Sequence, residues 1–243
     1  MSTNVVTYLA YYYFYCMFGW AYETIEVSIR KKEFVNRGFM SGPWLPIYGF
    51  GAMIYLVVCV PLKDYPVLVF LSGMATSTVM EYIAGALLLY IFKVRYWDYR
   101  KFKIQLHGHI CLTASLIWGM GALLFVYILH EPVVRFMGWI NPELLSVATL
   151  VITGIMGYDF ANSLRQALDL RRILANMEEM LDQLTEIVEK KSHGMIEKVS
   201  EYGKEMEKRL EEVSKKMLHR NPTASFEKYK ELSDQIRSRF RKK

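Results

Sequence analysis

Three acidic side chains stand inside long apolar segments of this sequence: Glu23, Glu81 and Asp159. A carboxylate at the centre of a membrane-spanning helix costs about 2.5–3.5 kcal/mol on insertion scales unless it is paired, protonated or in contact with water. Such acids commonly hold a cation or carry a proton, and they can also form structural salt bridges. The sequence therefore predicts a polar site built on these three carboxylates, with structural salt bridges as the alternative.

A second group of polar side chains lies between two apolar segments, in the stretch YWDYRKFKIQLHGH of residues 96–109. Asp98 stands beside Trp97, and His107 and His109 flank a glycine. Imidazole titrates near neutral pH, so the histidines suit a pH-sensitive pair or a polar ligand contact. Two histidines with carboxylates are also chemically adequate for a divalent ion. We expect a ligand contact here, with His107 and His109 as weak candidates for metal ligands, and no cofactor.

The bases and rings of this stretch also have a simpler explanation. Tryptophan and tyrosine rings suit the headgroup level of a bilayer, and Arg100, Lys101 and Lys103 would then meet anionic lipids. This explanation leaves Asp98 and the two histidines unexplained. Both interpretations stay open at the level of sequence.

The elements that must position these residues are apolar helices. Up to residue 164 the chain has 11 Lys/Arg and 9 Asp/Glu residues, against 19 and 15 in the remaining part. A membrane-spanning helix needs roughly 20 mainly apolar residues. Five segments are candidates, at about 5–27, 46–62, 66–92, 110–130 and 143–164. We therefore expect an all-α, multi-span transmembrane helix bundle over 1–164, with buried free thiols at Cys16, Cys59 and Cys111.

The basic loops set the expected orientation. Lysine and arginine gather after the first, third and fifth segments, whereas the loops after the second and fourth hold only Lys63 and Arg135. By the positive-inside rule, the N-terminus is outside and the C-terminus is cytoplasmic. At about 1.5 Å of rise per residue, Glu23, Glu81 and Asp159 then share one depth in the cytoplasmic half.

The segment NRGFMSGPWLPIYGFG of residues 36–51 interrupts the apolar pattern. Its two prolines and four glycines prevent one continuous helix. Irregular backbone at membrane depth must be buried in protein or line a cavity. The segment is expected either to bring Arg37 and backbone groups to the acids, or to form an interfacial connection with Trp44 and Tyr48 at headgroup level.

Six short sequence blocks follow one another in an order that is typical of a known family. They are FGWAYE at 18–23, RGFMSGPWLPIYGFG at 37–51, MEY at 80–82, WDY at 97–99, LHGHICL at 106–112 and WG at 118–119. Over roughly residues 5–165 the chain resembles the ABC-transporter type IV permease (CmpB-like) family of bacterial integral membrane proteins. The resemblance implies a multi-pass protein of the bacterial cytoplasmic membrane and names no substrate. It also implies an asparagine and an arginine beside the last glycine motif. This chain has Gln105 and His109 there, so that permanent positive charge is missing.

A charged tail follows the apolar domain. Its apolar residues alternate steps of 4 and 3 from Leu170 to Val188, as in a coiled-coil seam, and later follow an 11-residue period. We expect a cytoplasmic coiled-coil helix over 165–219 that forms a parallel homodimer, with an antiparallel partner or packing on the membrane face as the alternatives. A basic amphipathic helix over 220–243 should follow and suits anionic lipid or docking back on the coiled coil. No motif indicates nucleic-acid binding.

The favoured functional hypothesis is a transporter or channel-like protein with a cytoplasm-facing polar cavity for a small cationic or proton-coupled ligand. Its expected cavity residues are Glu23, Arg37, Glu81, Trp97, Asp98, Gln105, His107, His109 and Asp159. One alternative is a membrane-anchored scaffold or sensor that recruits a protein partner through its tail. Another is an intramembrane metal-dependent enzyme. The chain has no Walker A or Walker B motif, so we do not expect it to be an ATPase itself.

Overall fold

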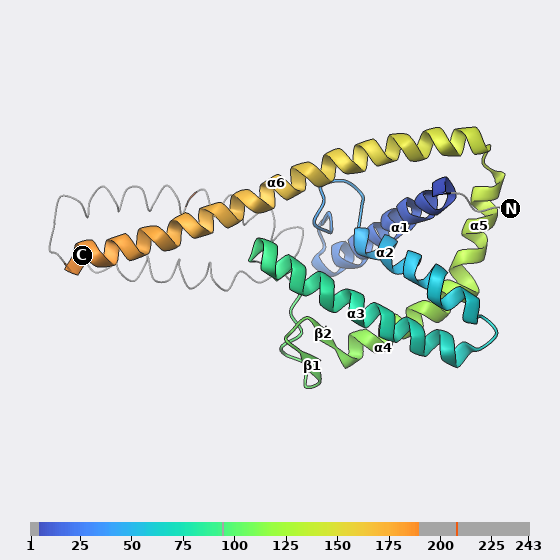
Figure 1. Cartoon of the computed structure of the whole chain (residues 1–243), viewed down its shortest axis with the longest axis horizontal. Helices are drawn as coiled ribbons and strands as arrows, with labels where there is room; N and C mark the ends of the chain where they lie inside the picture. The colour runs from blue at the N-terminus through green and yellow to red at the C-terminus, as the bar shows by residue number, and fades with distance from the viewer. Residues whose placement is uncertain (1–4, 94, 190–207, 209–243) are drawn as a thin grey trace. The chain divides into compact units, whose positions relative to one another are not determined.

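The structure is a computed structural model that describes residues 5–93, 95–189 and 208. Within these residues the chain is mainly helical, as expected, with one two-stranded hairpin (Figure 1). It divides into two compact units, and each is considered by itself. The first unit comprises residues 1–87 and 97–163, and the second comprises 88–96 and 164–243.

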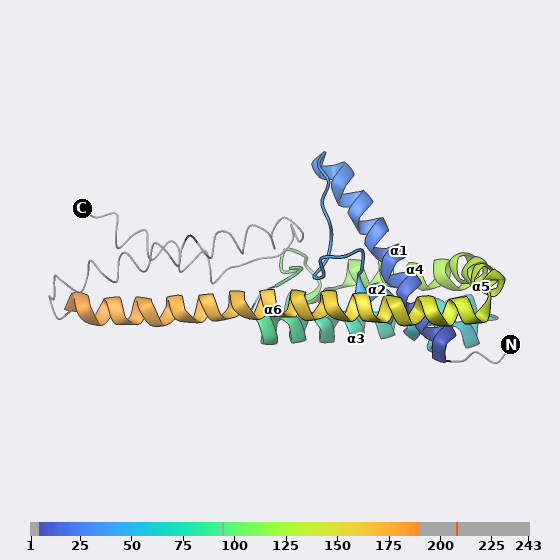
Figure 2. The same cartoon turned by 90° about the horizontal axis from the view of Figure 1, so that it is seen from above.

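Helix α1 (Val5–Lys31) buries a row of tyrosines in the first unit. Tyr11, Tyr13 and Tyr15 are only 6%, 6% and 4% exposed. The hydroxyl of Tyr13 lies 2.7 Å from that of Thr153 in α6, which ties the two helices together. Figure 2 shows α1 inclined steeply to the first part of α6. The tyrosine-rich start of α1 is therefore an interior surface between helices.

A loop and a short apolar helical run follow α1. The loop occupies residues 32–45, and the run comprises α2 (Pro46–Ile54), a π-helical turn (Tyr55–Cys59) and a 3₁₀ turn (Val60–Leu62). Pro46 opens α2 at a position where a missing N–H costs nothing. The run begins and ends where the second apolar segment was predicted, at 46 and 62, and it packs against α1.

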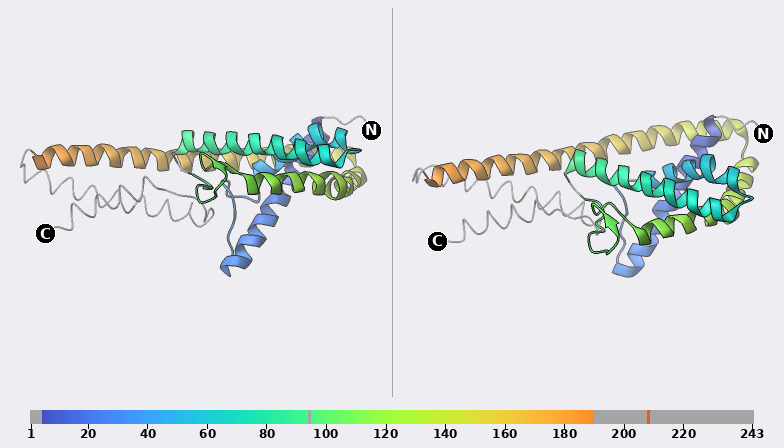
Figure 3. Two further views of the ribbon diagram at one scale, coloured as in Figure 1. Left: turned by 90° about the horizontal axis from the view of Figure 1, so that it is seen from below. Right: turned by 60° about the horizontal axis from the view of Figure 1, so that its bottom comes forward.

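The middle of the first unit is formed by α3 and α4, which lie side by side (Figure 3). Helix α3 covers Pro66–Phe92, and α4 covers Leu112–Leu124. A Cβ atom on Gly73 would lie 2.2 Å from the Cβ of Ala122, so the glycine permits this close packing. Strands β1 (Gln105–Leu106) and β2 (Ile110–Cys111) form the antiparallel hairpin in the connection between them.

The fourth apolar segment extends further than predicted. A π-helical turn (Phe125–Leu129) and α5 (His130–Trp139) continue α4, so Arg135 lies in a helix and the prediction of a loop there is wrong. The extension is held by packing, because Val133 is buried in the apolar core with Val134 and Met137 against it, and an exposed ion pair between Arg135 and Glu131, 3.1 Å apart, accompanies it. Helix α1 likewise runs past its predicted end, with Arg30 paired to Glu26.

Helix α6 (Pro142–Glu189) closes the described part of the chain. Three helical stretches are long and apolar enough to cross a membrane: Pro66–Phe92, Leu112–Trp139 and Pro142–Ile173. Helix α1 and the 17-residue run Pro46–Leu62 are not among them, so the count of five spans stays a prediction. The coiled-coil seam beyond Glu189 and the helix predicted over 220–243 lie outside the described residues, apart from residue 208.

The three cysteines are confirmed as buried free thiols. They lie in α1, in the π-helical turn after α2 and at the end of β2, directly before α4, in separate places of the first unit. Cys111 also has a local role, because its sulfur accepts a hydrogen bond from Ala114 N and caps α4.

Candidate functional site

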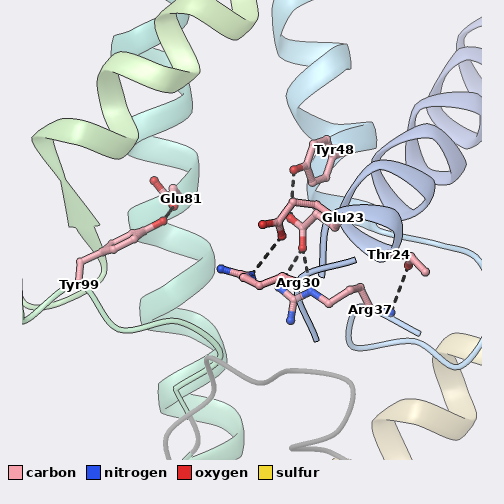
Figure 4. Close-up of polar contacts among 8 residues, drawn as sticks. Glu23, Thr24, Arg30, Arg37, Tyr48, Glu81 and Tyr99 are labelled. Carbon is pink, nitrogen blue, oxygen red and sulfur yellow. Dashed lines mark hydrogen bonds and ion pairs between the residues drawn. The ribbon is translucent and has the colours of Figure 1, made fainter. Parts of the chain in front are cut away.

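The Glu23 carboxylate is held by a guanidinium group and a phenol. Arg37 donates to Oε2 from Nε at 3.1 Å and from Nη2 at 2.9 Å. Tyr48 donates its hydroxyl to Oε1 at 3.0 Å (Figure 4). The side chains of Arg37 and Glu23 are 15% and 25% exposed, so the ion pair is largely shielded from solvent. The irregular segment thus brings Arg37 to one of the three acids.

Local sequence explains how Arg37 and Tyr48 reach Glu23. The backbone N–H groups of Val35 and Arg37 donate to Ser28 and Thr24, which fastens the loop along α1. Gly19 leaves room for the Tyr48 ring, since a Cβ atom there would lie 2.2 Å from the ring carbon Cγ. Tyr48 therefore packs into α1 one turn before the acid that it binds.

Trp44 and Tyr48 also show that the irregular segment 36–51 packs inside the protein. Trp44 is only 6% exposed, and Tyr48 is engaged with Glu23. Leu45 N also donates to the carbonyl oxygen of Cys16 at 3.0 Å, inside α1. The geometry favours the first expectation for residues 36–51, a buried segment that serves the acids, over an aromatic belt at headgroup level.

The Glu81 carboxylate has two neutral donors. Tyr99 donates its hydroxyl to Oε1 at 2.9 Å, and Trp118 donates Nε1–H to Oε2 at 3.2 Å. Glu81 is 4% exposed. No cation pairs with it among residues 5–93, 95–189 and 208. Two aromatic side chains thus orient a buried carboxylate in an apolar helix. They donate hydrogen bonds but supply no positive charge to balance the carboxylate.

The two acids are connected through a pair of rings. The Tyr48 and Trp118 centroids are 5.9 Å apart, with the planes tilted by 57°. The line of contacts therefore runs from Arg37 through Glu23, Tyr48, Trp118 and Glu81 to Tyr99. It joins α1, the loop after it, α2, α4, α3 and the segment before β1.

The surroundings of Tyr99 shift the pKa of its phenol. Burial raises its pKa above the ordinary value of 10.0, and the carboxylate of Glu81, to which it donates, raises it further. The charge of Glu23 adds a smaller push in the same direction. Tyr99 therefore stays protonated, and it can serve as a hydrogen-bond donor to Glu81 over the whole physiological pH range.

Asp159 has partners of a different kind. Its two oxygens accept from the backbone N–H groups of Ser41 at 3.2 Å and Gly42 at 2.8 Å. A side chain at Gly42 would collide with Trp44, whose Nε1 would lie 2.4 Å from the added Cβ. Asp159 thus ties α6 to the loop that carries Arg37, and no direct contact joins it to Glu23 or Glu81 among the described residues.

Asp98 and Trp97 lie in the segment that leads to β1. Asp98 accepts from the backbone N–H of Arg100 at 3.0 Å and from its Nη2 at 2.6 Å, a local ion pair. Trp97 donates Nε1–H to the carbonyl oxygen of His109 at 2.8 Å. Both contacts organise the segment itself, so the structure places these two predicted site residues beside the hairpin.

His107, Gly108 and His109 form the hairpin end. His107 and Gly108 have positive φ of 52° and 72°, and His109 N donates to Leu106 O at 3.0 Å, so the chain reverses in a tight turn between the two strands. Gln105 Oε1 accepts from Gly108 N at 2.7 Å, which supports the turn. The Tyr82 hydroxyl lies 3.0 Å from His107 Nδ1.

His109 is buried at 6% exposure against α3. A Cβ atom on Gly85 would lie 2.8 Å from His109 Nδ1, so the absent side chain makes room for the imidazole. Tyr82 meets the same ring edge to face at 5.5 Å. Across the residues that the structure describes, no group of three or more His, Cys, Asp or Glu side chains could hold a metal ion. The geometry gives the metal-enzyme alternative no support.

Three residues of this line were not predicted as site residues: Tyr48, Tyr99 and Trp118. All three are aromatic side chains with one polar tip, and each lies in one of the short blocks that carry the family resemblance. A tyrosine or tryptophan at the depth of a buried acid is a suitable neutral hydrogen-bond donor. The presence of these residue types near the acids could therefore have identified them as partners from the sequence.

The fold and these contacts describe a multi-helix protein with three helical stretches able to cross a membrane and a buried carboxylate at Glu81. A family model described as “Putative ABC-transporter type IV” matches residues 10–164, and the chain belongs to this family. A search of curated proteins and a search of solved structures each found no match. The match covers every acid, base and ring of the line described above. Family and apolar helices together identify a transporter-related membrane protein.

Proposed function

We propose that the chain is a membrane transport protein in which Glu81, assisted by Glu23, binds a small cation or carries a proton. One observation carries this proposal: a carboxylate that is 4% exposed in an apolar helix is held by neutral donors alone among the described residues. Burying such a group is costly, and a bound cation or a proton offsets that cost. Glu81 is therefore the proposed ligand-binding carboxylate.

The neighbouring side chains would give Glu81 and Glu23 different roles in ligand binding. Tyr99 and Trp118 orient the Glu81 carboxylate and leave the remaining lone pairs for a ligand. Glu23 already has the guanidinium of Arg37 as a counter-charge, so a cation that reaches it must compete with Arg37. The ring contact between Tyr48 and Trp118 links the two positions.

The proposal includes a polar cavity that opens toward the cytoplasm. The carboxylates would form its inner end, and the loop and hairpin residues would lie toward its mouth. These further residues are Arg37, Trp97, Asp98, Gln105, His107, His109 and Asp159.

Cation binding can be tested by the thermal stability of the purified full chain. The probes are sodium, potassium, magnesium, ammonium and a series of alkylammonium chlorides, each compared at equal ionic strength. We expect at least one cation to raise the melting temperature of the native chain and to lose this effect in Glu81→Gln. Glu131→Gln, at an exposed acid in α5, is the matched control and should respond like the native chain.

Two results would count against the site. If no cation stabilises the native chain, and if it moves no protons when reconstituted in dye-loaded vesicles, the proposed cation or proton binding is wrong. If folded Glu81→Gln keeps the native cation response or proton flux, Glu81 is not the binding carboxylate.

The membrane arrangement is proposed on the loop charges and the tail pattern. We propose five spans with the N-terminus outside, in the bacterial inner membrane, and a cytoplasmic tail that forms a homodimer through 165–219. Anionic lipid would bind the basic segment 220–243. A reporter active only in the cytoplasm, fused to the C-terminus, should be active. Cross-linking through the tail should give dimers that a chain ending at residue 169 does not form.

A further inference from the structure

The segment between α3 and α4 exposes apolar side chains outside the apolar helices. Phe102, Ile104 and Leu106 are 45%, 65% and 49% exposed. They alternate along the chain with Lys101 and Lys103, which are exposed as well. Water-facing apolar groups interleaved with bases are unfavourable in solution and are typical of a surface that meets a bilayer interface.

The charge on this segment comes from the two lysines. Arg100 is neutralised by Asp98, with Nη2 and Oδ2 2.6 Å apart. Neither Lys101 nor Lys103 forms an ion pair within the residues that the structure describes. Two ammonium groups are thus available for an anion, and their long stems allow them to reach phosphate oxygens.

The segment has a defined shape rather than a loose one. Phe102 N donates to Tyr99 O at 2.9 Å, and Leu112 N donates to Ile104 O at 3.1 Å. Tyr99 N is bound to Gly108 O at 3.0 Å, so the segment is closed onto the hairpin turn at its base. The Phe102 ring also meets the Tyr99 ring edge to face at 5.7 Å. Its apolar and basic side chains are consequently presented together at a surface.

From this arrangement we propose that residues 100–106 bind anionic phospholipid at the membrane surface. Lys101 and Lys103 pair with the phosphates, while Phe102, Ile104 and Leu106 enter the boundary between headgroups and acyl chains. A soluble anion would satisfy the lysines and leave the apolar side chains in water, so the combination favours lipid as the occupant. The two lysines and three apolar side chains that carry this binding are not among the residues of the proposed cation site, so the proposal stands without that site.

Lipid binding is measured by native mass spectrometry of the delipidated full chain. The probes are dioleoyl phosphatidylglycerol, dioleoyl phosphatidylcholine and inorganic phosphate. We expect tighter binding of phosphatidylglycerol to the native chain, with a loss on the order of tenfold in Lys101→Gln/Lys103→Gln. The matched double variant Lys63→Gln/Arg135→Gln removes the same charge from exposed positions elsewhere and should keep native binding.

A second measurement tests the apolar half of the surface. A nitroxide attached at Ile104→Cys, in vesicles with phosphatidylglycerol, should be relaxed by oxygen dissolved in the lipid more than by an aqueous nickel chelate. The unsubstituted chain is treated with the same label to correct for any reaction at the three buried native thiols.

Four outcomes would overturn the proposal. If the native chain binds the two lipids with equal affinity, the negative charge of the lipid is not recognised. Unchanged phosphatidylglycerol affinity in the Lys101/Lys103 variant places binding elsewhere. Displacement of the lipid by inorganic phosphate, or a label at position 104 relaxed mainly from water, reduces the surface to an anion site.

Discussion

Tyr48 and Trp118 lie ring to ring, with centroids 5.9 Å apart, and each donates a hydrogen bond to a different acid of the apolar helices. Tyr48 comes from α2 and binds Glu23 of α1, whereas Trp118 comes from α4 and binds Glu81 of α3. One aromatic contact therefore links two carboxylates and joins residues of four helices. We expect a shift of either ring to weaken the hydrogen bond that it donates.

The first prediction concerns the glycine that admits the Tyr48 ring. In Gly19→Ala the new Cβ would meet the ring at 2.2 Å, so Tyr48 must move away from α1 and from Glu23. Overpacking of this kind costs about 1–3 kcal/mol. We expect a clearly lower melting temperature of the purified chain, measured in detergent.

Gly154→Ala is the matched control for that change. A Cβ atom at Gly154 meets nothing within 4 Å, and alanine is the better helix former, so stability should be unchanged or slightly higher. Equal behaviour of the two variants would show that the ring does not pack into α1 as described.

The second prediction measures the Glu23–Arg37 pair by a double-mutant cycle. Glu23→Gln and Arg37→Gln should each destabilise the chain, because each removes one charge of an ion pair that is largely shielded from solvent. The double variant should be more stable than the two losses predict together, with a coupling energy above about 1 kcal/mol and up to about 3 kcal/mol.

The exposed Glu131–Arg135 pair provides the comparison. Its side chains are 62% and 70% exposed, so the same cycle should give a coupling energy of about 1 kcal/mol or less. A Glu23–Arg37 coupling no larger than this would mean that the pair is solvated and contributes little.

The third prediction concerns Tyr99. Tyr99→Phe removes one of the two donors to Glu81, and the loss of a hydrogen bond to a buried carboxylate costs about 1–3 kcal/mol. Tyr158→Phe, at a residue that is 73% exposed, should be close to neutral in the same melting experiment.

The effect of Tyr99 should also depend on pH with a defined sign. Burial and the Glu81 carboxylate raise the pKa of Tyr99 above 10.0, so the folded chain holds this proton more tightly than the unfolded chain does. Its stabilising contribution is present in full below about pH 10 and declines as pH rises through the folded pKa. The difference in melting temperature between native chain and Tyr99→Phe should therefore shrink above pH 10. A difference that is constant or grows there would contradict the pKa shift.

The helices were largely predictable because their signal is local. Apolar length alone located 46–62 and 66–92 with the bounds that the structure has. The segment predicted at 110–130 was too short, since Glu131 and Arg135 were interpreted as a loop. These two residues instead pair across one turn of α5, which continues to Trp139. Apolar residues at helical spacing among the charges, Val133, Val134 and Met137, pack against the core and continue the helix beyond the uninterrupted apolar stretch.

The site was predictable in its acids and not in their partners. Glu23, Glu81 and Asp159 stood out because each is an acid in an apolar segment. The sequence suggested one shared level for all three. The structure instead gives each its own partners: a guanidinium and phenol, two aromatic donors, and two backbone N–H groups. The shared cavity therefore remains a proposal.

By itself, the sequence of this protein determined the apolar helices, the acids within them, the basic loops and the family. These are properties of residue type and spacing along one chain. Tertiary structure alone decided that Arg37 reaches Glu23, that Tyr99 and Trp118 converge on Glu81, and that His109 fits against Gly85. Each contact joins residues from different elements. Their proximity depends on how helices pack, for which small residues such as Gly19, Gly73 and Gly85 leave the necessary space.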